Sequence, residues 1–304
     1  MQAIGIEALQ EGDILLMMGE GPLSDLIAWA SDGVYSHAGI VVDNGDLVEA
    51  SLGGVRRYPL ARRMTEFEHF HFIDAWRPRD AHGHAFDPAD LALVRDHAAT
   101  MLGLPYPVDQ LALLGVVMAV RGKWPVHPAL RKLVRIALDR ALPTQSPGMV
   151  CSEVVYRAWA ECAAEPRGRM GPAIVEGERG TAPLPPIDWK RLAEEFGPLL
   201  FPKPAGRLRG TGPLDAQSLS GDPDAPTDEA LEQARQQVLS RLGHGSLLRT
   251  SGPAALASHH PNPRLVSPQD LANSPATWCV GRLLERERQQ LCHGFARMDA
   301  DLHG

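Results

Sequence analysis

The stretch GVYSHAGIVVDNGDLVEAS, from Gly33 to Ser51, joins two strand patterns through a turn and carries two titratable side chains. The run SHAGIVV is rich in β-branched residues, and the Asn44-Gly45 pair is the strongest short signal for a hairpin turn. A turn centred on this pair sets position 49 opposite about position 40, and strand stagger then brings Glu49 diagonally next to His37. The stretch therefore predicts a β-hairpin that joins a histidine to a carboxylate.

The two titratable residues of this hairpin have structural alternatives. A histidine in a core is often hydrogen-bonded and inert, and an edge strand can hold a solvated acid. A buried carboxylate beside His37, however, would fix its tautomer and favour the imidazolium form. The pattern makes His37 and Glu49 candidates for a catalytic base and the residue that orients it.

Further strand and helix patterns surround the hairpin. Residues 13–18 and 67–76 read as strands, and residues 22–31 have apolar positions at helical spacing. Later helices are predicted at residues 87–103, 111–120 and 129–142, and from about 151 to 164. The expected fold class is α+β, with a small antiparallel sheet on which a helix that begins at Cys151 packs.

Proline content divides the chain into three predicted parts. Residues 1–164 form the catalytic core, and residues 165–263 are a proline-rich insertion or linker with one helix, over TDEALEQARQQVLSRLG. Residues 264–304 are a helical segment that returns to the core. The helix inside the insertion has Thr227 as its expected N-cap.

Composition bounds the class of protein and its partners. The net charge of -7 over 304 residues argues against nucleic acid as a partner. The four cysteines match no CxxC metal site, and no cofactor is expected. The N-terminal residues lack a secretory signal pattern, so the default location is the cytoplasm, with export by a specialised secretion system as the alternative.

Cys151 is the strongest nucleophile candidate among the cysteines. It follows Pro147 and Gly148, which break the preceding structure, and it opens an amphipathic helix. The unpaired N–H groups and positive dipole at a helix N-terminus favour a thiolate and could hold an oxyanion, to which Ser152 is a further candidate contributor. The alternative is a buried structural cysteine, which is common for this residue type.

Taken together, the segments GDILLM, GPLSDLIAWAS, YSHAGIVV, LVEAS, GLPYPVD, VCSEVVYRAW and VSPQDLANSP resemble the circularly permuted branch of the NlpC/p60-like, papain-like cysteine hydrolases. This branch is similar to the lecithin:retinol acyltransferase-like enzymes. In it the histidine strand precedes the cysteine helix, as His37 precedes Cys151 here. The resemblance covers residues 12–159 and returns at 267–275, and the proline-rich stretch between them departs from the family pattern.

The resemblance implies a role for each matched residue. Cys151 matches the nucleophile, His37 the base, and Glu49 the polar residue that orients the base. Tyr106, in GLPY, matches a tyrosine that leans toward the nucleophile and can donate to the oxyanion; its alternative is an ordinary packed tyrosine. Metal ions have no part in this chemistry.

Three functions follow from these expectations. The first is amide hydrolysis in peptidoglycan peptides through an acyl-enzyme. The second is hydrolysis or transfer of lipid acyl groups, because residues 111–138 interleave apolar residues with cations in a pattern that suits a membrane surface; two helices packed on the core are the alternative. The third is an inactive binding module. If the protein is an exported antibacterial effector, an inhibitor or immunity protein would be a partner.

Overall fold

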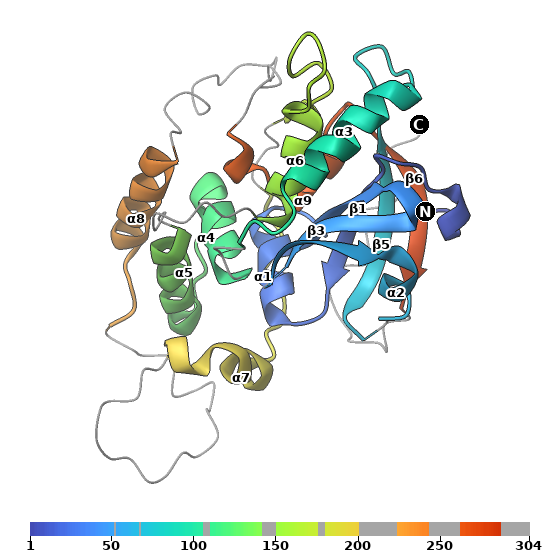
Figure 1. Ribbon diagram of the computed structural model, residues 1–304. Coiled ribbons are helices and arrows are strands. Elements are labelled where there is room, and N and C mark those ends of the chain that lie inside the picture. Colours follow the sequence, from blue (N-terminus) through green and yellow to red (C-terminus); the bar gives the residue numbers. More distant parts are fainter. Residues whose placement is uncertain are drawn as a thin grey trace, which may run out of the picture.

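The computed structural model describes residues 1–51, 53–66, 68–105, 110–141, 150–175, 180–200, 224–242 and 262–286, with the backbone alone at 44, 110 and 195–200. Its centre is a six-stranded sheet in the order β4-β3-β2-β1-β5-β6, in which every neighbouring pair is antiparallel (Figure 1). The α+β class predicted from the sequence is confirmed. The strands are β1 (Ile14–Gly19), β2 (His37–Val42), β3 (Asp46–Ser51), β4 (Gly54–Pro59), β5 (Phe70–Pro78) and β6 (Thr277–Glu285).

The predicted hairpin is present as β2 and β3, but its register differs by one residue. The loop is a 3-10 turn over Asp43–Gly45, so Gly39 rather than residue 40 lies opposite Glu49. Gly45 has a φ of 70°, a left-handed conformation that glycine adopts without steric cost. Because directly opposed residues share a face, Glu49 and His37 are diagonal neighbours on one face of the sheet.

Helices cover the opposite face of the sheet, where the main hydrophobic core lies. Ala38, Ile40 and Val48 are among the buried strand residues of that core, and α6 packs against both β2 and β3. A smaller cluster, including Leu15, Met17 and Val41, lies on the face that carries Glu49. The helices of the main-core side are α1 (Pro22–Ala30), α3 (Pro88–Thr100), α6 (Cys151–Ala160) and α9 (Pro268–Ala272), whereas α2 (Leu60–Arg63) adds Leu60 to the smaller cluster.

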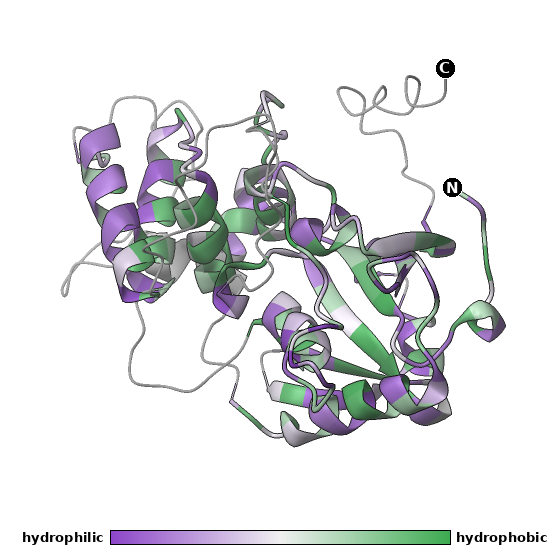
Figure 2. Ribbon diagram, turned by 90° about the horizontal axis from the view of Figure 1, so that it is seen from above, coloured by the Kyte–Doolittle hydropathy of each residue, from purple (hydrophilic) through white to green (hydrophobic). Residues whose placement is uncertain are grey.

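A second group of helices lies to one side of the sheet, beyond α1 (Figures 1 and 2). It contains α4 (Gln110–Arg121), α5 (Pro128–Ala141), α7 (Trp189–Leu200) and α8 (Asp228–Arg241), and α5 contacts the other three. Thr227 caps α8 as predicted, since its side chain accepts a hydrogen bond from the Ala230 N–H. The described residues of the proline-rich stretch thus contain two helices, where the sequence predicted one, and both pack on the rest of the protein.

Of the predicted helical segment 264–304, the structure describes residues 264–286. In this described part α9 is the α-helix and residues 277–285 form β6, which pairs with β5 along its length, so a helix is the wrong prediction for 277–285. Arg282 on β6 also donates hydrogen bonds to Asp74, a fully buried carboxylate on β5. Residues 277–285 become a strand because they pair with β5, which lies about 200 residues earlier in the chain. The local pattern of apolar residues cannot predict a partner so distant in the sequence.

Within the described ranges, no helix is both long and apolar enough to cross a membrane.

Candidate functional site

Cys151 is the first residue of α6, and the local sequence explains why the helix begins there. Val150 is extended, with φ of -79° and ψ of 161°, and its N–H donates to the Glu153 carboxylate at 3.3 Å. Glu153 therefore reaches back over the first turn, as the third residue of a capping box does. The N–H groups of Cys151 and Ser152 lie in the first turn, where a helix has no internal acceptors for them. Cys151 itself is fully buried.

His37 links the cysteine to the acid. Its Nε2 lies 3.0 Å from Oε2 of Glu49, so Nδ1 is the ring nitrogen left for the Cys151 thiol. Burial opposes a charge on the ring, but the charge and hydrogen bond of Cys151, together with Glu49, outweigh it and raise the pKa of His37 to about 9. The side chain of His37 is 20% exposed and reaches solvent, whereas Glu49 behind it is fully buried.

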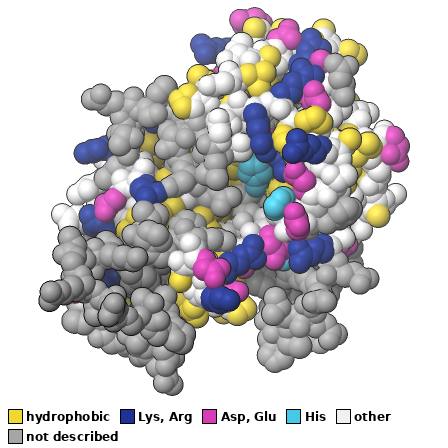
Figure 3. All heavy atoms as spheres, turned by 60° about the horizontal axis from the view of Figure 1, so that its bottom comes forward, with side chains coloured by type: hydrophobic (Ala, Val, Ile, Leu, Met, Phe, Trp, Pro, Cys, Tyr) yellow, Lys and Arg dark blue, Asp and Glu magenta, His cyan; other side chains and the backbone are white. Residues whose placement is uncertain are grey.

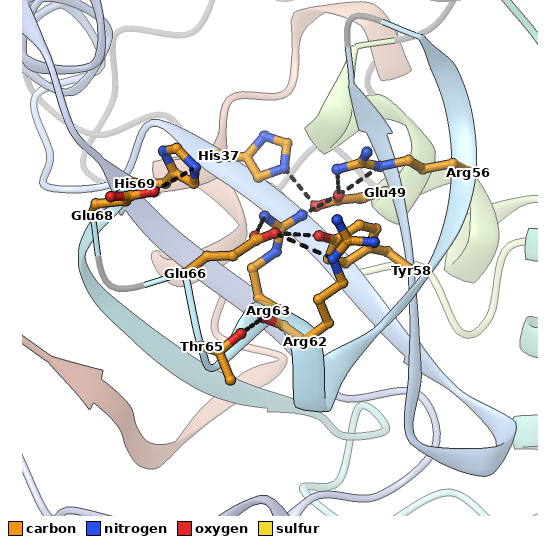
Figure 4. Close-up of polar contacts among 10 residues, drawn as sticks. All are labelled: His37, Glu49, Arg56, Tyr58, Arg62, Arg63, Thr65, Glu66, Glu68 and His69. Carbon is orange, nitrogen blue, oxygen red and sulfur yellow. Dashed lines mark hydrogen bonds and ion pairs between the residues drawn. The ribbon is translucent and has the colours of Figure 1, made fainter.

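Glu49 is a buried carboxylate with three side-chain partners. Arg56 donates from Nε at 3.0 Å and from Nη2 at 2.7 Å, and Arg63 donates from Nη2, all to Oε1. Burial alone would raise the pKa of Glu49, but His37 and the two guanidinium groups lower it to about 2. The arginines thus occupy one carboxylate oxygen and leave the other, Oε2, to His37 (Figure 4).

Arg63 is itself held from its other side. Its Nη1 donates to Oε2 of Glu66 at 2.6 Å, and the Tyr58 hydroxyl donates to Oε1 of the same carboxylate. The guanidinium groups of Arg56 and Arg63 lie 4.2 and 4.5 Å from the centre of the Tyr58 ring. We call Arg56, Tyr58, Arg63 and Glu66 the arginine brace of Glu49 (Figure 4).

Of the two remaining predicted site residues, the structure describes Ser152. The Ser152 hydroxyl donates to the Val266 carbonyl at 2.6 Å, which leaves its backbone N–H as the group that can serve an oxyanion. Tyr106 lies outside the described residues. The structure therefore brings together Cys151, His37 and Glu49 of the five predicted residues.

The other cysteines that the structure describes have different surroundings. Cys162 is buried, and its thiol donates to the Trp159 carbonyl at 3.3 Å. Burial raises the pKa of Cys162 and also that of Cys279 on β6. Cys292 lies outside the described residues.

Other histidines near the sheet pair with acids of their own. His71 lies 3.2 Å from Glu20, and His84 lies 3.4 Å from Asp80. His69 lies 3.8 Å from Glu68, apart from the His37–Glu49 contact (Figure 4). Among the described residues, no group of three or more histidine, cysteine, aspartate or glutamate side chains is arranged to hold a metal ion.

Sequence reasoning missed Arg56 and Arg63. Both lie in the run RRYPLARR, residues 56–63, which reads as a charged surface segment. One signal was present: the hairpin continues into β4, where Arg56 lies directly opposite Glu49. An opposite charge at that cross-strand position is the expected partner of a buried acid.

No protein-family model matches the chain, and no curated protein matches it. Among solved structures, the chain is similar to one described as the crystal structure of metalloprotein yiiX from Escherichia coli O157:H7, DUF1105. The two chains are 18% identical, the match covers 89% of this chain and 96% of that one, and the TM-score is 0.40. A likeness at this level does not indicate a function.

Proposed function

We propose that the protein is a thiol hydrolase in which Cys151 is the nucleophile, His37 the general base and Glu49 the residue that orients the base. The observation that carries this proposal is the relay from Glu49 through His37 to Cys151, contributed by β3, β2 and the first turn of α6. A nucleophile, a base within its reach and a third group that fixes the base are the parts that covalent acyl transfer requires.

The chemistry proceeds in two steps. With the thiol proton held on Nδ1 of His37, the sulfur of Cys151 attacks the acyl carbon of the substrate to form a tetrahedral oxyanion. The backbone N–H groups of Cys151 and Ser152 are positioned to donate to that oxyanion. When the carbon–leaving group bond breaks, the imidazolium gives its proton to the leaving group. His37 then takes a proton from a water molecule as the water oxygen bonds to the acyl carbon; the carbon–sulfur bond breaks, the acid product leaves, and the proton is again shared between His37 and Cys151.

The connectivity agrees with the permuted papain-like arrangement that the sequence resembles. His37 precedes Cys151 by 114 residues, and the helix of the cysteine packs on the strand of the histidine. We extend the proposal to this fold family, in which a thiol, an imidazole and a polar side chain perform the same acyl transfer.

For the substrate we propose the amide bond of peptidoglycan peptides. The lipid alternative was motivated by residues 111–138, and in the structure the apolar residues of that run are core residues; Leu113 and Val117 are 1% and 3% exposed. Its cations pair with acids of the protein, including Arg121 with Asp270 at 2.6 Å and Lys123 with Asp32 at 2.6 Å. This supports the interpretation as two packed helices.

The surface charge points the same way. On the face seen in Figure 3, basic and acidic side chains lie close together around the histidines that are visible there. An interface that lies on an anionic membrane combines an apolar face with an excess of cations. The mixed charges of this face do not have that character.

The test is mass analysis of peptidoglycan fragments and of phospholipid vesicles incubated with wild type and with Cys151→Ala. We expect wild type to cleave an amide in the peptide fragments, Cys151→Ala to be inactive, and Cys279→Ala to match wild type. Release of fatty acid from vesicles, absent with Cys151→Ala, would instead establish the lipid reaction. Turnover that persists in Cys151→Ala would overturn the mechanism.

An inactive binding module is separated from both enzymes by thiol reactivity. A module without catalysis needs no activated sulfur, whereas in an active enzyme iodoacetamide should alkylate Cys151, beside His37, faster near neutral pH than Cys162, whose pKa is raised by burial. Site-resolved mass spectrometry after a short iodoacetamide treatment measures this difference, with Cys162 as the internal reference. Equal, slow labelling of both cysteines would favour the inactive module.

A further inference from the structure

The arginine brace is a group of charged side chains next to the proposed site that has no part in the chemistry described above. It holds Glu49 from the side away from His37, and its members come from β4, from α2 and from Glu66 just after α2. We propose that Arg63 is a positioning residue: through the brace it keeps Glu49 ionised and turned toward His37, and thereby sets the pH range in which the His37–Cys151 pair works. This inference rests on the function proposed above.

The geometry divides the two oxygens of Glu49 between two tasks. Oε1 receives the N–H groups of Arg56 and Arg63, and Oε2 receives Nε2 of His37. A carboxylate with only one partner can rotate about its terminal bond or exchange its oxygens, since that torsion has broad minima. With Oε1 fixed by guanidinium groups, Oε2 points at the ring, and the ring in turn presents Nδ1 to the thiol.

Arg63 is better placed for this role than Arg56. The side chain of Arg63 is 6% exposed and that of Arg56 is 43% exposed. A charge acts more strongly where water is excluded, so the buried guanidinium is the stronger electrostatic partner of Glu49. Among the described residues, Nε of Arg63 is buried without a hydrogen-bond partner, so the hydrogen bonds of this guanidinium come from its two Nη groups.

Glu66 and Tyr58 contact Arg63 and hold its guanidinium in place. Glu66 accepts from Nη1 of Arg63 and from the Tyr58 hydroxyl, so the charge of the arginine is shared between two carboxylates. The ring of Tyr58 packs under the guanidinium at 4.5 Å, an arrangement that favours a cation. The planar guanidinium can serve both carboxylates at once, which a lysine ammonium cannot do with the same geometry.

The groups that influence the ionisation of this pair come from several elements. In the described part of the chain, Cys151 from α6 acts on His37, and Arg56 from β4 and Arg63 from α2 act on Glu49. Glu66 and Tyr58 bear on the pair only through Arg63, since Glu66 accepts from both of them. The neighbouring β1 and β5 contribute the uncharged Met17 and Ile73 to this face. The brace is therefore the main source of positive charge behind Glu49.

The experiment compares Arg63→Met and Arg63→Lys with the matched control Arg62→Met. Arg62 is the preceding residue of the same helix. Its guanidinium also lies over Tyr58, at 5.4 Å, and its Nε is 3.9 Å from Oε1 of Glu66, but its side chain is 71% exposed and makes no ion pair with Glu49 among the described contacts. The first measurement is an NMR titration of the Glu49 carboxyl carbon in the full chain, assigned by its loss in Glu49→Gln. The second is the rate of Cys151 alkylation by iodoacetamide between pH 4 and pH 9.

In Arg63→Met we expect the pKa of Glu49 to rise from about 2 by about 1 to 3 pH units, the usual effect of removing an adjacent opposite charge. Cys151 alkylation at pH 4 should then fall by up to about ten-fold, because a Glu49 pKa near 5 leaves only about a tenth of the carboxylate ionised at that pH. In Arg63→Lys both the pKa of Glu49 and the rate of Cys151 alkylation should lie between those of Arg63→Met and wild type. Arg62→Met should match wild type in both measurements. With peptide substrate, the loss should lie in kcat, with KM little changed.

A Glu49 titration in Arg63→Met that equals wild type, with an unchanged alkylation profile, would overturn the proposal and leave Arg63 a merely structural residue. If Arg63→Met does not fold, Arg63→Lys tests the proposal instead. An Arg63→Lys variant with the wild-type Glu49 titration and the wild-type kcat would contradict the need for a guanidinium at this position. If the Glu49 pKa rises while no hydrolytic activity exists in wild type, the electrostatic role stands and the proposed function alone fails.

Discussion

Replacing Glu49 with glutamine tests whether its buried charge is stabilised as the structure indicates. The pKa of Glu49 is about 2, against 4.5 for an unperturbed carboxyl. Each pH unit of difference corresponds to about 1.4 kcal/mol, so the ionised carboxylate contributes about 3 kcal/mol to folding at neutral pH. Glu49→Gln removes this contribution and leaves the buried Arg63 without one of its two carboxylate partners, which adds to the loss.

The sign of the pH dependence is fixed by the lowered pKa. The stabilisation is complete above about pH 4.5 and disappears as pH falls through about 2. The difference in free energy of unfolding between wild type and Glu49→Gln should therefore be about half as large at pH 3 as at pH 7.

Urea unfolding at pH 7 and pH 3 measures this difference, with Glu68→Gln as control because the side chain of Glu68 is 85% exposed. A loss of unfolding free energy in Glu49→Gln no larger than that in Glu68→Gln, or one that is the same at both pH values, would refute the stabilising role of the Glu49 charge.

Other predictions follow from the charges and burial described above. The pKa of His37 is raised, so its proton is present at neutral pH and is lost as pH rises through about 9. The rate of turnover, and the rate of Cys151 alkylation relative to that of a free thiol, should therefore decline above about pH 9. A pH–rate profile measures both declines. Leu113→Asp places a charge at a site that is 1% exposed and should prevent folding, as circular dichroism would reveal, whereas Val126→Asp, at 92% exposure, should change the free energy of unfolding by less than about 0.5 kcal/mol. Asp270→Asn removes the charge that pairs with the buried Arg121 and should cost about 3 to 5 kcal/mol in urea unfolding; a cost below about 1 kcal/mol would contradict a structural role for this pair.

The hairpin shows how far local sequence determines the site. The pattern SHAGIVV-DNGD-LVEAS predicts two antiparallel strands with His37 and Glu49 near each other, and the structure has both. The register was wrong because a two-residue turn was assumed, whereas the loop spans Asp43–Gly45. Three-residue loops that end in a left-handed glycine are a common alternative, and the two differ by one residue in pairing. That single residue decides which face Glu49 occupies.

Features that depend on distant partners could not be predicted. The segment TWCVGRLLE becomes a strand because β5 offers a free edge, and nothing within the segment reports where that edge lies. Likewise, Arg63 is buried only because Glu49 and Glu66 converge on it, while in sequence it resembles the exposed Arg62 beside it. The identity of a helix cap, such as Thr227 for α8, is local and was therefore predictable.

The order of the parts along the chain also has a consequence for biogenesis. His37 and Glu49 are synthesised early, Cys151 follows 114 residues after His37, and the strand that completes the sheet comes at 277–285. The edge of β5 therefore stays unpaired during synthesis until residues 277–285 have left the ribosome, and a late-pairing strand delays folding and leaves an edge open to aggregation. A chain cut before residue 277 would hold His37, Glu49 and Cys151 without the finished sheet behind them.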